Sequence, residues 1–534
     1  MNDFARDPDA SVDRAAARVL FDRFRKDFLG LACRDAVADP ERTEKRRVYL
    51  DTGATALMPR VLHEAIGAYC GRALGNSHSS AHRAARATSR EIAYARSAVE
   101  KFVAADPARH VALFAGNGAT GALNLLADAL FPAEVRLLLR GARIKDQEIR
   151  DALGGVREAA RERGADRAAM LRRNVVVVSR MEHHSNILPW MRAVGSRNLR
   201  FPELTRDGRL DVADLARILE AEGDRVRVVA LTGASNVTGV LNPIREVARL
   251  AHAAGAEVVV DGAQWAPHAR IVMHDPADPA GDVDHLALSA HKLYAPGSRG
   301  VLVTTRETFP GPDAVGVVGG GMADVVSVAG FSASPDVTQR EEGGTPNLTG
   351  SIGIGVVVEA LSRFGMELVE EHERGLVASG LERLDRIPGV TLYGPRDVAT
   401  APRVAVFSFN VGDLPHGFVA AALSDACNVA VRNGSFCAQL YVRHLLGGGD
   451  AEALLDAPIG GCGTLPGLVR ASSGIYTDDD DLAALEDGIR YVVRNAQALA
   501  AEYEVGPGGE FVHRGLGRST AFEIRSEVDR YFDS

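Results

Sequence analysis

The chain contains little cysteine, little tryptophan and no long apolar run. Its 534 residues include five cysteines and two tryptophans. No apolar run reaches the roughly 18 residues that a membrane span requires, and the first residues lack the apolar core of a secretory signal. We therefore expect a protein that neither crosses nor binds a membrane and that resides in the cytoplasm.

The cysteines are odd in number and widely spaced along the chain. They are Cys33, Cys70, Cys427, Cys437 and Cys462. Such spacing fits neither a disulfide framework nor a zinc cluster, and it favours reduced thiols in a reducing compartment. We expect no metal site.

An excess of basic residues is also absent. The formal net charge is −9, whereas nucleic-acid-binding proteins usually carry a basic face, so no nucleic-acid partner is expected. The hydrophobic content of 46% and charged content of 25% are ordinary for a globular enzyme. A chain of 534 residues is too long for one hydrophobic core, so two or more domains are predicted.

Short β-branched runs alternate with helical segments over much of the chain. The predicted strands are Val175–Val178, Val226–Leu231, Glu257–Val260, Leu286–Ser289 and Val301–Thr304. Apolar strands that alternate with helices predict an α/β fold with a mostly parallel sheet covered on both faces.

The same pattern divides the chain into four parts. We predict an N-terminal helical segment over 1–47, a large domain over 48–350, a smaller C-terminal α/β domain over 351–503 and a tail over 504–534. The large domain is interrupted by a highly charged insertion over 134–173, predicted to be a helical surface element. A long helix is expected from Ser351 to Leu384, and a final one from Asp479 to about Ala500.

Lys292 and Asp261 are the most informative pair of residues. Lys292 follows one predicted strand, and Asp261 closes the strand before it. In pyridoxal 5′-phosphate (PLP) enzymes a lysine forms a Schiff base with the cofactor aldehyde, and an aspartate keeps the pyridine nitrogen protonated. The pair alone would more often be a surface lysine with a solvated aspartate, but other segments favour the PLP interpretation.

Three further clusters follow predicted strands. A glycine-rich loop before Ala119 and Thr120 runs into a helix, whose free N–H groups favour a phosphate. His183 could stack on a pyridine ring, and Asn236 and Gln264 could donate to a phenolic oxygen. Because ligands in open α/β sheets bind at the carboxyl ends of strands, these clusters are expected to share one crevice.

Taken together, five segments resemble the signature blocks of class V aminotransferase-fold PLP enzymes, in particular the cysteine desulfurase and selenocysteine lyase branch. The segments are 182–186, 235–239, 261–264, 291–294 and 343–347. The resemblance implies PLP fold type I, with Lys292 carrying the internal aldimine, Asp261 on the pyridinium nitrogen and His183 on the ring. It also implies that Asn236 and Gln264 contact the phenolic oxygen.

The resemblance assigns the phosphate and the subunit contact as well. Ala119, Thr120, Ser289 and His291 would hold the phosphate. Thr345 would reach the phosphate of the partner subunit's cofactor, which implies a homodimer.

Two more positions bear on the reaction. Cys437 falls where the desulfurases of the family place a nucleophilic cysteine, and Arg432 nearby is compatible with a thiolate. Arg470 falls where the family binds the substrate α-carboxylate, a task that suits the arginine fork. Arg470, Arg432 and Asn236 would contact the substrate, but Cys437 could instead be an inert buried cysteine.

The chain also departs from the family pattern. Gly53 stands where many members carry a side chain, Gly121 where glutamate is common, and Phe436 where histidine often precedes the cysteine. These departures leave the cofactor assignment intact and bear on the substrate.

The leading hypothesis is therefore removal of sulfur from L-cysteine, or of selenium from selenocysteine, through Lys292 and a persulfide on Cys437. A sulfur-acceptor protein would be a partner of such an enzyme. A PLP-dependent C–S lyase, epimerase or aminotransferase is the alternative, in which Cys437 is incidental. A sulfur-relay or scaffold protein is the alternative from another class.

Overall fold

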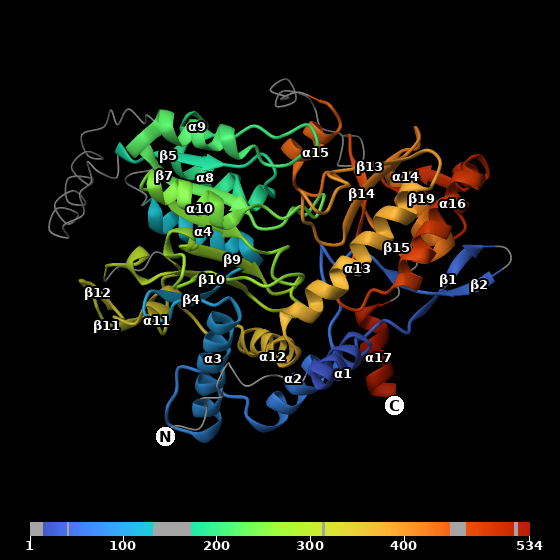
Figure 1. Ribbon diagram of the computed structural model, residues 1–534. Coiled ribbons are helices and arrows are strands. Elements are labelled where there is room, and N and C mark those ends of the chain that lie inside the picture. The colour runs from blue at the N-terminus through green and yellow to red at the C-terminus, as the bar shows by residue number, and fades with distance from the viewer. Residues whose placement is uncertain are drawn as a thin grey trace.

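The computed structural model describes residues 14–39, 42–131, 172–311, 316–448, 466–516 and 522–533. The charged insertion expected over 134–173 therefore lies outside the described residues, apart from its last two positions. Two sheet-containing bodies lie side by side in Figure 1, with the larger on the left and the smaller on the right. Within the described residues, no helix is long and apolar enough to cross a membrane.

The larger body is built on a seven-stranded sheet. In spatial order its strands are β4 (His110–Ala115), β10 (Gly300–Thr305), β9 (His285–Ser289), β8 (Glu257–Asp261), β7 (Val226–Thr232), β5 (Val175–Val178) and β6 (Leu199–Arg200). Only β10 runs antiparallel to its neighbours, β4 and β9; the other pairs are parallel. All five predicted strands are present, and the prediction of a mostly parallel sheet is confirmed.

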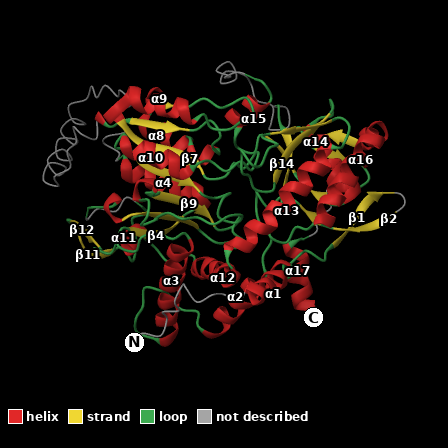
Figure 2. Cartoon of the chain, in the orientation of Figure 1, coloured by secondary structure: helices red, strands yellow, loops and turns green. Residues whose placement is uncertain are grey.

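Alternate residues of these strands pack into two separate cores because successive side chains point to opposite faces. One face packs against α4 (Gly118–Leu130) and α8 (Leu188–Val194). The opposite face packs against α3 (Arg83–Phe102), α9 (Val212–Glu222), α10 (Ile244–Ala253) and α12 (Leu348–Phe364). Figure 2 shows the strands enclosed by these helices.

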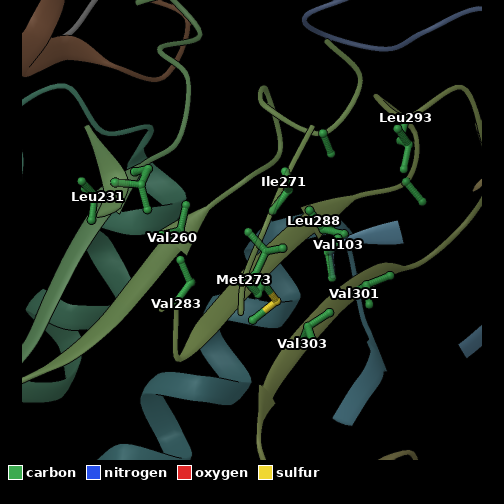
Figure 3. Packing of buried hydrophobic residues seen from close by; sticks show 14 of the residues in the cluster. Val103, Leu231, Val260, Ile271, Met273, Val283, Leu288, Leu293, Val301 and Val303 are labelled. Atoms are coloured by element: carbon green, nitrogen blue, oxygen red, sulfur yellow. The ribbon is translucent and has the colours of Figure 1, made fainter. Parts of the chain in front are cut away.

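Figure 3 shows a part of the second core from nearby. Leu231, Val260 and Leu288 come from three neighbouring strands and lie on the same side of the sheet as Met273. Both faces being buried explains why the strands are continuous apolar runs and not alternating ones.

The smaller body contains a four-stranded antiparallel sheet. Its order is β13 (Val390–Tyr393), β14 (Val406–Val411), β17 (Leu468–Ser472) and β16 (Arg432–Gly434). It packs with α13 (Met366–Asp385), α14 (His416–Cys427) and α16 (Asp479–Glu502) around a core of its own. A capping box of Asp478 and Asp481 begins α16, close to the predicted start.

The long helix expected from Ser351 to Leu384 is two helices, α12 and α13. Gly365 separates them with a φ of 82°, a left-handed conformation that a helix interior does not admit. Its N–H donates to Leu361 O and so closes the end of α12. Because glycine has no side chain, it adopts this backbone without strain, and the chain passes here from the larger body into the smaller one.

The segment 1–47, expected to be helical, is only partly so. α1 (Arg14–Arg25) is a helix, but β1 (Arg34–Asp39) and β2 (Arg42–Arg46) form an antiparallel pair. The prediction was wrong for residues 34–39 and 42–46. Asp35 lies opposite Lys45, and the Lys45 ammonium donates to Ala426 O at the end of α14, so tertiary contacts favour the strands.

The remaining elements are short or peripheral. They are α2 (Arg60–Arg72), α11 (Val337–Glu341), α15 (Gln439–Leu445), α17 (Ile524–Asp533), β3 (Val48–Tyr49), β11 (Ala323–Ser327), β12 (Gly330–Ala333), β15 (Val429–Ala430), β18 (Tyr503–Val505) and β19 (Phe511–His513). The parallel pair of β3 and β15 joins residues 48–49 to the smaller body. The domain boundaries at 47, 350 and 503 stay predictions.

Candidate active site

One cavity of about 330 Å³ collects nearly all of the predicted site residues. It lies at the carboxyl ends of the parallel strands, as expected for an open α/β sheet. The predicted residues that line it are Ala119, Thr120, His183, Asn236, Asp261, Gln264, Ser289, His291, Lys292, Arg432, Cys437 and Arg470. Thr345 is not among its lining residues; its hydroxyl accepts a hydrogen bond from the Asn76 side chain.

Lys292 and Asp261 face the same cavity from neighbouring strand ends. Burial lowers the pKa of Lys292 to about 8, and the charge of Asp261 only partly opposes this. Burial also raises the pKa of Asp261, against the effects of the Ala263 N–H and of Lys292. A cation held against this carboxylate would favour its charged form, so Asp261 is suited to bind a positively charged ring nitrogen.

His183 is held as a neutral ring. Burial, followed by the charge of Lys292, lowers its pKa to about 3. The Ser185 N–H donates to His183 Nδ1 at 3.1 Å, which places the ring proton on Nε2. A neutral, fixed imidazole can lie flat against an aromatic cofactor without adding charge to it.

A small polar cradle lies at the start of α4. Ala119 N–H donates to Ser289 Oγ at 2.9 Å, and the Thr120 and Ser185 hydroxyls are 2.6 Å apart. Gly118 has a φ of 59°, and a Cβ at this position would lie 2.9 Å from Ser289 Oγ. The first N–H groups of a helix and nearby hydroxyls form the donor set that a phosphate requires.

Arg470 is a buried cation that also lines the cavity. The residue is 2% exposed, its Nη1 donates to Asn236 O at 3.0 Å, and its Nη2 donates to Asp51 Oδ1 at 3.1 Å. Arg432 also approaches Asp51, at 3.5 Å. Asp51 was not among the predicted site residues, although it begins the segment that contains Gly53.

The ring of Phe436 covers the guanidinium of Arg470. The Arg470 carbon Cζ lies 4.9 Å from the ring centroid, within cation–π range. Phe436, which stands where the family often has histidine, therefore packs on Arg470, the predicted carboxylate-binding residue. The sequence alone did not predict this contact, because Phe436 and Arg470 lie in different segments of the chain that only the fold brings together.

Cys437 lies in a constrained turn at the cavity. Phe436 and Cys437 both have left-handed backbones, with φ of 53° and 54°. Asn236 Nδ2 donates to Phe436 O at 2.9 Å, and His184 N–H donates to Cys437 O at 2.7 Å. Left-handed non-glycine residues cost roughly 1–3 kcal/mol each and persist where the surroundings hold them. The turn presents an exposed cysteine to the cavity.

The residues of the cavity fit PLP. Lysine, aspartate, a neutral histidine and a set of phosphate donors line one cavity, and these are the kinds of group that hold PLP. Gln264 Oε1 is buried and has no hydrogen-bond partner among the described residues.

Known proteins are similar to this chain over most of its length. The aminotransferase class-V family model matches residues 48–144 and 159–485. A probable cysteine desulfurase of Halalkalibacterium halodurans is 30% identical over 456 residues, which cover 85% of this chain and 95% of the relative. A cysteine desulfurase of Dickeya dadantii is 35% identical over 323 residues, which cover 60% of this chain and 70% of the relative.

Solved structures are similar as well. A cysteine desulfurase from Thermococcus onnurineus matches with a TM-score of 0.66 and 27% identity, over 84% of this chain and 95% of that chain. A cysteine desulfurase from Escherichia coli matches with a TM-score of 0.65 and 26% identity, over 89% of this chain and 98% of that chain. These matches confirm the resemblance that the five segments indicated. The chain belongs to the aminotransferase class-V family.

Proposed function

We propose that this protein is a PLP-dependent enzyme that removes sulfur from L-cysteine, or selenium from selenocysteine. The observation that carries the proposal is one cavity lined by Lys292, Asp261, Arg470 and Cys437. Its relatives named as cysteine desulfurases support the same reaction. Desulfuration is the reaction among the alternatives that needs the cysteine as well as the other three residues.

The cavity offers each part of PLP a partner. Lys292 would attach to the aldehyde, Asp261 would bind the pyridine nitrogen, and His183 would lie on the ring. Thr120, Ser289, His291 and the N–H groups at the start of α4 would bind the phosphate. When bound, PLP supplies an electron sink for the charge that develops when the substrate loses its α proton.

Lys292 is suited to move that proton. With a pKa lowered to about 8 by burial, its Nζ can be uncharged in a useful fraction of molecules near neutral pH. The same atom can return the proton after the sulfur has left. Burial of Lys292 thus supports a role in both attachment and proton transfer.

Arg470 would bind the substrate carboxylate. A planar guanidinium can donate two parallel hydrogen bonds to a carboxylate, and burial strengthens such contacts. Asp51 balances the charge of Arg470 and Phe436 covers its face, so the fork has a fixed orientation. Cys437 lines the same cavity, so a substrate held by Arg470 would share that space with the thiol.

Cys437 would carry out the sulfur transfer. Its thiolate attacks the sulfur of the bound L-cysteine, an S–S bond forms, and the C–S bond of the substrate breaks. The electron pair of the C–S bond stays on the substrate carbon, which takes up a proton, so the products are alanine and a persulfide on Cys437. The exposed position of Cys437 supports later transfer of this sulfur to an acceptor protein.

A homodimer and a cytoplasmic location are further parts of the proposal. Thr345 does not line the cavity of its own chain, which is compatible with a role at a partner's cofactor. For the location, no disulfide links the four cysteines of the described residues, which fits a reducing compartment. Light scattering that found an active, PLP-loaded monomer would remove the dimer from the proposal.

A product assay tests the proposed function. The purified protein is reconstituted with PLP and incubated with L-cysteine and a thiol reductant, and alanine, pyruvate and sulfide are measured. We expect alanine and sulfide in equal amounts. Pyruvate in place of alanine would indicate β-elimination. If neither alanine nor pyruvate forms, cysteine is not the substrate.

The site of PLP attachment is tested separately. Borohydride reduction followed by peptide mapping should label Lys292, and Lys292→Ala should lose covalent attachment. If another lysine carries the label, the assignment of the cavity fails.

A further inference from the structure

The tight turn that carries Cys437 has a strained backbone. Residues 435–438, here called the cysteine turn, are closed by a hydrogen bond from Ala438 N–H to Ser435 O at 2.8 Å. The two central residues, Phe436 and Cys437, have φ of 53° and 54°. A turn with positive φ at both central positions favours asparagine, aspartate and glycine, because other side chains are strained there. Contacts from outside the turn must therefore hold this conformation.

Three of these contacts form a closed circuit with Arg470. Arg470 Nη1 donates to Asn236 O at 3.0 Å, and Asn236 Nδ2 donates to Phe436 O at 2.9 Å. The phenyl ring of Phe436 completes the circuit, with its centroid 4.9 Å from Arg470 Cζ. All three residues are buried, with exposed fractions of 2% for Arg470, 7% for Asn236 and 7% for Phe436. A cation–π contact is strongest where water is excluded in this way.

The cysteine turn also contacts the segment that contains His183 and His184. His184 N–H donates to Cys437 O at 2.7 Å, and Gln439 N–H donates to His184 Nε2 at 3.4 Å. These hydrogen bonds, like that of Asn236, involve main-chain groups of residues 436–439, so they are available whatever side chain stands at position 436. The ring of Phe436 is therefore the contact that a substitution can remove by itself.

We propose that Phe436 is a positioning residue, whose ring packs on Arg470 and so holds the cysteine turn and its thiol in the cavity. The inference rests on the proposed function, because sulfur transfer requires the thiol of Cys437 to meet the substrate. Phe436 stands where related desulfurases often have histidine, so the contact with Arg470 is a property of this chain's own residue. The alternative is a ring that only fills space beside Arg470.

Hydrogen exchange of the PLP-loaded protein tests the turn without any reaction. Phe436→Leu removes the ring and keeps an apolar side chain, and both residue types are disfavoured in a left-handed backbone, so the intrinsic strain stays the same. The N–H of His184, which donates to Cys437 O, should exchange at least fivefold faster, while segments away from the cavity keep their rates. An unchanged exchange rate at His184 would overturn the inference.

The first turnover with L-cysteine tests the consequence for sulfur transfer. Without a reductant each site forms one alanine and one persulfide, so the rate of this turnover reports the attack by Cys437. Phe436→Leu should lower the rate about tenfold, the equivalent of about 1.4 kcal/mol, because misplaced reacting groups are costly.

Binding of L-alanine separates this effect from an effect on Arg470. L-Alanine has the carboxylate but no sulfur, and its binding is followed by the change in the PLP absorption band. Arg470 keeps its hydrogen bonds to Asn236 and Asp51 in Phe436→Leu, so this binding should weaken less than threefold. Weaker binding of L-alanine with an unchanged first turnover would show that the ring serves Arg470 alone, against the inference.

Two further variants at position 436 keep the test decisive. Phe436→Tyr keeps the face of the ring and should recover most of the turnover rate lost in Phe436→Leu; no recovery would contradict a role for the ring. If Phe436→Leu does not fold, Phe436→Met fills the same space with a flexible side chain and has the same expected results.

The chain offers a matched control in Phe407. This residue is fully buried in the smaller body, its ring centroid lies 5.8 Å from Arg403 Cζ, and it does not line the cavity. Phe407→Leu should lower Tm and leave the exchange of His184 and the first turnover unchanged. Equal effects from Phe407→Leu and Phe436→Leu would overturn the inference. A wild-type protein that makes no alanine from L-cysteine would overturn the proposed function, whereas the exchange experiment would still decide whether the ring holds the turn.

Discussion

Arg470→Lys isolates the contribution of the guanidinium fork to substrate binding. Lysine keeps a positive charge beside Asp51, so the variant avoids leaving that carboxylate without a cation. The contact of Nη1 with Asn236 O would be lost, at a cost to stability of about 1 kcal/mol. The fold should therefore survive the change.

The expected rise in KM follows from the geometry of the guanidinium fork. A lysine makes a point contact with a carboxylate where an arginine makes two parallel hydrogen bonds, so one charge-assisted hydrogen bond is lost. Such a bond contributes about 1.5–3 kcal/mol, which corresponds to a rise in KM of about 10- to 150-fold. The absorption band of the protein without substrate should not change, because lysine keeps a positive charge at this position.

The assay measures alanine formed from L-cysteine over a range of substrate concentrations. Cysteamine, which lacks the carboxylate, is the control ligand: its binding, followed by the change in the PLP absorption band, should be the same in the wild-type protein and in Arg470→Lys. If KM for L-cysteine rises less than about threefold, or if cysteamine is weakened as much as L-cysteine, Arg470 does not bind the carboxylate.

Three other substitutions test the remaining parts of the site. Cys437→Ser should abolish alanine and persulfide formation while PLP binding stays normal. Full activity of this variant would refute desulfuration and favour elimination or transamination, in which Cys437 is incidental. Asp261→Asn should fold and bind PLP but lose turnover by about two orders of magnitude or more, because the charge that holds the ring proton is gone; near-normal kcat would refute that role. Gly53→Ala should raise KM for L-cysteine, since a Cβ there would lie 3.0 Å from Ser472 Oγ and 3.2 Å from both Arg470 Nη2 and Gln264 Oε1; an unchanged KM would show that this space is not used by substrate.

Local sequence patterns predicted the scaffold of the larger body well. The five predicted strands are present because a buried parallel sheet requires continuous β-branched runs, which are visible in the sequence. Lys292, Asp261 and His183 could be brought together from sequence because each follows a strand, and the carboxyl ends of parallel strands share one edge.

Tertiary structure decided the features that depend on contacts between distant segments. The strands at 34–39 and 42–46 pair with each other and contact α14, and neither contact is visible in the local pattern. The pairing of Arg470 with Asp51 joins residues more than 400 positions apart, and the contact of Gln264 with His268 and Glu373 links the two bodies. Residue types and periodicity report which surfaces must be buried, but the partner of each buried polar group follows only from how the bodies pack.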